Sequence, residues 1–188
     1  MLATIVTVLG AVIATLLMAS LMYALIWDGF QHGDVIRLIG TDITNKPKRF
    51  FSAGMIIYLT TGLALCWLYY MTIQFLNIQT FLVSAGVGGA IGFVTGFAMM
   101  YWFIYEVFAI QEVNQQYAKY WIPTAIAHWF GHMAFGFSLG TMISAFVLYG
   151  MNSFWLAAAL NLVAAGGIML FAKKTEIIDS YHRRQAHG

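Results

Sequence analysis

The segment SAGVGGAIGFVTG (84–96) carries a small side chain at every fourth position, at Ser84, Gly88, Gly92 and Gly96. Residues four apart lie on one face of an α-helix, so the segment predicts a helix with one smooth face. Without a hydrophobic drive between helices in lipid, such small faces allow two helix backbones to approach closely. The segment therefore predicts a membrane-spanning helix that packs tightly on a partner helix.

The composition of the whole chain is that of an integral membrane protein. Of the 188 residues, 61% are hydrophobic and 9% are charged, so little of the chain is suited to water. A helix needs about 20 apolar residues to cross a bilayer. Stretches of that length occur at about 2–27, 50–74, 81–110, 122–149 and 153–172. We therefore predict an all-α integral membrane protein with five transmembrane helices in one domain (1–172), surrounded by the lipid bilayer, and a polar tail (173–188).

The charged side chains predict the orientation of these helices. The basic residues follow the first, third and fifth spans, at Arg37, Lys46, Lys48, Arg49, Lys119, Lys173, Lys174, Arg183 and Arg184. The acidic residues fall in or beside the same segments. Because cytoplasmic loops carry an excess of Lys and Arg, we expect the amino terminus outside and the tail in the cytoplasm. The net charge of +2 gives no indication of a nucleic-acid partner.

A possible duplication links the first four spans. MYALIWDGFQHGDV (22–35) aligns without gaps on MYWFIYEVFAIQEV (100–113), and the same offset pairs Gly62 with Gly140. This pattern predicts a tandem helical hairpin, with halves of about 1–78 and 79–150. Two such hairpins predict a four-helix bundle with a parallel two-fold axis, and the helix at 153–172 packed outside it.

The fourth span has a small face that matches the third. Gly136 and Gly140 lie one turn apart, and the two spans run antiparallel. We therefore expect Gly88, Gly92 and Gly96 to pack against them. Continuing the same step of four backwards from Gly136 reaches His132 and then His128. The histidines thus continue the packing face of the fourth span.

These histidines are the main candidate for a site. Glu106 lies fourteen residues beyond Gly92, which is about 21 Å and nearly four turns, so it returns to the same face at the depth of His128. Asp28 and His32 follow the first span at the same end. Two imidazoles four residues apart and one carboxylate form a set suited to Zn, Fe, Mn or Cu. A second interpretation is that the histidines only hydrogen-bond between helices. A third is that they form a proton relay or contact lipid headgroups.

Haem binding by this chain alone is disfavoured. Two histidines on one helix face cannot bind opposite sides of one iron, so a bis-histidine haem would need His32 or a partner chain. The sequence has no CxxC motif. Its glycine-rich segment GVGGAIG begins like a nucleotide-binding loop, but the surrounding residues are apolar, so it is better explained as a helix-packing face. Because these enzyme motifs are missing, the sequence disfavours an enzyme. A small transporter is also disfavoured, because no charged side chain lies near the middle of a span.

One motif resembles a known group of proteins. HMAFGFSLG (132–140) resembles the H-x-A-[FY]-G-F-[ST]-L-G ending of a family of small polytopic prokaryotic membrane proteins of unknown function. GAVIATLLM (10–18) and DVIRLIGT (34–41) are similar to the opening of that family. The resemblance implies a membrane fold of four or five helices in the cytoplasmic membrane of a prokaryote. It singles out His132 and implies no activity.

Two functional interpretations follow. The first is a non-catalytic accessory subunit of a larger membrane complex, of the bioenergetic kind, because the small helix faces and short loops suit packing against other membrane subunits. The second is a membrane metalloprotein in which His128, His132 and Glu106 hold a transition-metal ion for redox or hydrolytic chemistry.

Overall fold

The structure is a computed structural model of the chain, and it describes residues 2–27, 35–41, 43–109 and 121–186. All regular elements in these ranges are helices. They are α1 (Leu2–Trp27), α2 (Val35–Thr41), the short 3₁₀ helix η1 (Pro47–Arg49), α3 (Phe50–Phe75), α4 (Phe81–Ala109), α6 (Trp121–Tyr149) and α7 (Met151–Ala186). Five of them, α1, α3, α4, α6 and α7, are long and apolar enough to cross a membrane. The prediction of five such helices is confirmed.

The helix ends agree closely with the sequence-based boundaries, with two differences. The helix α7 continues through the polar tail to Ala186. The segment 35–41 forms the short helix α2. This helix was not predicted, because it is much shorter than the apolar length of a spanning helix. Tight turns connect the long helices where the backbone adopts positive φ, at Asn77 (φ 47°) between α3 and α4 and at Gly150 (φ 86°) between α6 and α7. Glycine tolerates this conformation because it has no Cβ.

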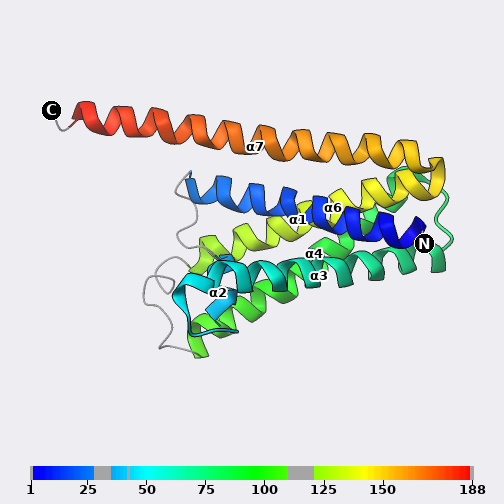
Figure 1. Cartoon of the computed structure of the whole chain (residues 1–188), viewed down its shortest axis with the longest axis horizontal. Helices are drawn as coiled ribbons and strands as arrows, with labels where there is room; N and C mark the ends of the chain where they lie inside the picture. The colour runs from blue at the N-terminus through cyan, green and yellow to red at the C-terminus, as the bar shows by residue number, and fades with distance from the viewer. Residues whose placement is uncertain (1, 28–34, 42, 110–120, 187–188) are drawn as a thin grey trace.

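Two helices form the centre of the molecule. Within the membrane-length windows, 56% of α1 and 61% of α6 are buried inside the chain, against 28% of α3, 28% of α4 and 22% of α7. Figure 1 shows α7 along one side of the α1 and α6 pair, and α3 with α4 along the other. The helix α7 packs on α1 and α6, while α4 packs mainly on α6. The peripheral helix expected from the sequence is therefore one of three helices around a central pair.

This packing is not symmetric. The repeat would make α1 equivalent to α4 and α3 equivalent to α6, yet α1 packs extensively on α6 whereas α3 and α4 make few contacts. The expected two-fold relation between hairpins is not seen in the described contacts, and the tandem repeat stays a prediction about the sequence. On α7, Ala165 is buried but Ala164 faces outward. The inward positions of α7 are instead Phe154, Ala158, Ala165 and Ala172.

The small faces of α4 and α6 lie directly against each other. A Cβ atom at Gly88 would collide with the carbonyl oxygen of Gly136 and lie 2.8 Å from the Cα of Gly140. A Cβ at Gly92 would lie 3.1 Å from the Cα of Gly136, and one at Gly96 would lie 2.7 Å from the Cβ of His132. Only glycine allows backbones this close. The contact brings α4 beside the turn of α6 that carries the histidines.

Glycines also dock α2 onto the start of α3. A Cβ at Gly54 would collide with the carbonyl oxygen of Ile36, and one at Gly40 with the carbonyl oxygen of Phe50. This contact buries the side chains of Ile36 and Ile39. The helix α2 thereby covers one end of the space between α1, α3 and α6.

Candidate functional site

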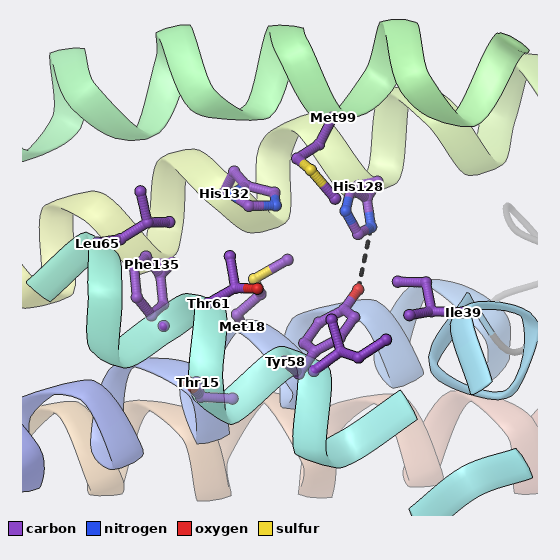
Figure 2. Close-up of a pocket in the computed structure, with 12 residues that line it drawn as sticks. Thr15, Met18, Ile39, Tyr58, Thr61, Leu65, Met99, His128, His132 and Phe135 are labelled. Carbon is purple, nitrogen blue, oxygen red and sulfur yellow. Dashed lines mark hydrogen bonds between the residues drawn. The ribbon is translucent and has the colours of Figure 1, made fainter. Parts of the chain in front are cut away.

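His128 and His132 both point into the interior of the helix assembly. They lie one turn apart on α6, and only 2% and 5% of their surfaces are exposed. Their ring centroids are 4.9 Å apart and their planes are inclined by 58°. In Figure 2 the two imidazoles lie side by side on α6 and face the space between α6, α3 and α1. The structure therefore brings together the two histidines that the step of four placed on one face.

Tyr58 of α3 is the nearest polar partner of the pair. Its hydroxyl oxygen lies 3.1 Å from Nδ1 of His128, with donor and acceptor set by the histidine tautomer. The two rings meet edge to face, with centroids 5.9 Å apart at 84°. The sequence-based search missed Tyr58, although a step of four connects it to other buried positions of α3. These positions are Gly54, Tyr58, Gly62 and Cys66.

His132 has a different environment. Its Nδ1 atom is buried and has no hydrogen-bond partner within the described chain. Its ring lies near Phe135, with centroids 6.5 Å apart. The Cβ of His132 faces Gly96, where an added Cβ would lie 2.7 Å away. A buried ring nitrogen without a partner is costly unless a water, an ion or another ligand satisfies it.

A small cavity adjoins both rings. It offers about 30 Å³ of space for the centres of water molecules, enough for about two waters. Its polar lining consists of the two histidines, Tyr58 and the hydroxyls of two threonines, Thr15 and Thr61. Two methionines, Met18 from α1 and Met99 from α4, add thioether sulfur atoms. None of the described lining residues carries a formal charge.

The structure does not describe the side chains of the predicted carboxylate ligands. The backbone of Glu106 belongs to α4, but its side chain is outside the described residues, as are Asp28 and His32 altogether. Across the ranges that the structure describes, no three His, Cys, Asp or Glu side chains gather as a metal site. The predicted set of His128, His132 and Glu106 is thus represented here by its two histidines.

A second buried polar contact lies further along α6. The Tyr69 hydroxyl of α3 donates to the backbone carbonyl of Ser84 on α4, and the Ser144 hydroxyl donates to the carbonyl of Gly140. The oxygen of Tyr69 would lie 3.0 Å from a Cβ placed on Gly140. Because α3 and α4 make few other contacts, this hydrogen bond is a structural link between them.

Comparisons of the chain with protein-family models, with curated proteins and with solved structures gave no match. The family resemblance of residues 132–140 accordingly stays a prediction.

Proposed function

We propose that this chain is a non-catalytic accessory subunit of a larger membrane complex. Two outward-facing glycines on α7 carry the proposal. A Cβ at Gly166 or Gly167 would meet nothing within 4 Å in the described chain, so neither glycine serves packing among the described residues. Glycine within a helix costs about 1 kcal/mol relative to alanine. Small residues on a lipid-facing surface instead suit the close approach of a helix from another subunit.

The outer faces of the helix assembly agree with this role. The membrane-length window of α7 is only 22% buried within the chain. Its outward side chains include Leu156, Leu160, Val163 and Leu170, all strongly exposed. These faces suit lipid contact around a helical neighbour at Gly166 and Gly167. The proposed complex is bioenergetic in kind, as the sequence analysis expected.

We also propose which end of the chain faces the cytoplasm and in which membrane the chain resides. The described basic residues lie on α2, at the start of α3 and on the carboxyl-terminal part of α7, and Figure 1 shows these segments toward one end of the molecule. Under the positive-inside rule, that end is cytoplasmic and the amino terminus is external. The proposed location is the cytoplasmic membrane of a prokaryote.

Purification from native membranes in mild detergent tests the subunit role. The wild-type chain is expected to carry at least one other membrane protein in fixed ratio. Gly167→Leu should release that protein without changing the thermal stability of the chain itself, because the space at Gly167 is open. Val94→Leu, at an exposed position on α4 and therefore away from the proposed interface on α7, is the control and should retain the partner. A wild-type chain that runs alone overturns the proposal.

A second candidate function is a membrane metalloprotein, in which His128, His132 and Glu106 bind a transition-metal ion near the cytoplasmic face. The observation that favours it is the buried imidazole pair with its unpartnered Nδ1 of His132. Elemental analysis of the purified chain tests it, with His128→Ala, His132→Ala and Glu106→Gln as variants. Equimolar metal that all three variants lose supports this candidate, and metal-free protein contradicts it.

A further inference from the structure

We propose that the cavity beside His128 and His132 binds one cuprous ion, held by the two imidazoles and by the sulfur atoms of Met18 and Met99. The inference rests on the second candidate function, because it uses the same histidine pair. It differs in the remaining donors, since thioethers replace the carboxylate of Glu106.

The spacing of the two rings suits a shared ion. Metal–nitrogen bonds are about 2.0 Å, and a ring centroid lies about 1.1 Å beyond the nitrogen, so two imidazoles at a roughly tetrahedral angle have centroids about 5 Å apart. The observed separation is 4.9 Å. A linear two-coordinate arrangement would need about 6 Å by the same geometry. The separation therefore fits an ion with additional ligands better than a linear two-coordinate ion.

One of the two rings makes the second hydrogen bond that is usual for a metal ligand. Metal-bound histidines usually hydrogen-bond through their other ring nitrogen, which fixes tautomer and orientation. Tyr58 supplies that contact to Nδ1 of His128 and leaves Nε2 of this ring for an ion. On His132 the buried Nδ1 has no partner in the described chain. The ring of His132 lines the cavity, so an ion there would meet this ring.

Two methionines complete the donor set. Met18 packs against α6 at Gly131, which lies between the two histidines in sequence. A Cβ there would lie 3.0 Å from Sδ of Met22 and 3.3 and 3.4 Å from Cγ and Cε of Met18. Met99 extends from α4 beside His128 in Figure 2, and both methionines line the cavity with the histidines. The absence of a side chain at Gly131 thus leaves room for the side chains of Met18 and Met22.

The chemistry of the donors selects the ion. Thioether sulfur is a soft ligand that favours Cu(I), whereas carboxylates suit harder ions. The described lining is uncharged, and the penalty for burying an ion rises with the square of its charge. A monovalent ion is therefore much better suited to this cavity than a divalent one. The volume of about 30 Å³ accommodates one ion in place of water.

The test uses the full chain in detergent, loaded anaerobically with Cu(I) as its acetonitrile complex in the presence of ascorbate. After removal of unbound metal, the wild type should retain one copper per chain against a competing cuprous chelator. Its X-ray absorption spectrum should show sulfur neighbours at about 2.3 Å besides nitrogen. Met18→Leu and Met99→Leu, which conserve volume, should each lower the affinity at least tenfold and reduce the sulfur signal. His132→Ala should abolish retention.

Met142→Leu is the matched control, since Met142 is fully buried on α6 but does not line the cavity. It should bind copper as the wild type does. The methionine variants keep the test decisive if a histidine variant fails to fold. A wild type that retains no copper overturns the proposal, as does unchanged affinity in both Met18→Leu and Met99→Leu.

Other outcomes separate this proposal from the functions proposed above. Glu106→Gln should leave Cu(I) binding unchanged. Zinc retention that requires Glu106, without Cu(I) retention, overturns the cuprous site and supports the His, His, Glu metalloprotein. A chain that binds no metal rules out both. The accessory role is decided independently by co-purification.

Discussion

The hydroxyl of Tyr58 on α3 lies 3.1 Å from Nδ1 of His128 on α6, across seventy residues of sequence. The two helices otherwise make few contacts. This hydrogen bond therefore holds a peripheral helix to one of the two central ones. It also fixes the ring orientation of a histidine that lines the cavity.

Tyr58→Phe should destabilise the protein by removing this bond while keeping the ring. A typical buried hydrogen bond contributes about 1 kcal/mol, which corresponds to a fall in the unfolding temperature of about 2–4 °C for a chain of this size. Thermal unfolding in detergent, followed by size-exclusion chromatography, measures the change. Tyr101→Phe is the control, because Tyr101 is 70% exposed on α4. Equal stability of the two variants would contradict the structural role of Tyr58.

Gly88→Ala and Gly89→Ala should have opposite effects although they are neighbours. A Cβ at Gly88 would collide with the backbone of Gly136, whereas one at Gly89 would have its nearest neighbour at 3.8 Å, on Phe137. Overpacking costs about 1–3 kcal/mol, so Gly88→Ala should lower the unfolding temperature. Gly89→Ala should be neutral or stabilising by about 0.5–1 kcal/mol through helix propensity. Comparable losses in both variants would argue against the α4–α6 contact described here.

Gly54→Ala should loosen α2, because the added Cβ would collide with the carbonyl oxygen of Ile36. The readout is thiol labelling of Ile39→Cys in a Cys66→Ala background, since Ile39 is only 3% exposed. Labelling should be slow with Gly54 and faster after Gly54→Ala. Ser52→Ala, at an exposed position on the same turn of α3, should leave the rate unchanged. Fast labelling with Gly54 in place would mean that α2 does not dock.

Lys46→Cys and Lys173→Cys should be accessible from the same side of the membrane, and Gln79→Cys from the opposite side. All three positions are exposed. Lys46 and Gln79 lie beside helix ends, and Lys173 lies where the apolar part of α7 ends. With the proposed orientation, a membrane-impermeant thiol reagent labels Gln79→Cys in intact cells and the two lysine variants only in inverted vesicles. Cys66, which is fully buried, serves as the unlabelled internal control. Labelling of Lys46→Cys and Lys173→Cys from opposite sides would refute the five-span topology.

The helices could be predicted because their signals are local. The length of each apolar stretch predicts a spanning helix, and the five stretches correspond to α1, α3, α4, α6 and α7. Spacing along a single helix likewise placed His128 and His132 on one face. Tyr58, Met18 and Met99 could not be found in this way, because each comes from a different helix and joins the histidines only through packing.

The contact between α4 and α6 was predicted from their glycines, but the rest of the helix arrangement was not. A soluble helix shows its buried face by contrast with polar residues. Here outward and inward faces are similarly apolar, as exposed Leu160 and buried Phe154 on α7 illustrate. The central position of α1 and α6 and the peripheral position of α4 were therefore not predicted.

The sequence by itself determined which segments form apolar helices and which turns of α4 and α6 carry no bulk. Both properties depend on the length and spacing of residues within one segment. Only the tertiary structure decided which helix faces enclose His128 and His132. It left Nδ1 of His132 without a hydrogen bond in the described chain and placed both rings beside a cavity with Met18 and Met99. The physical reason is that an apolar side chain suits lipid and protein interior equally, so its destination depends on how neighbouring helices fit together.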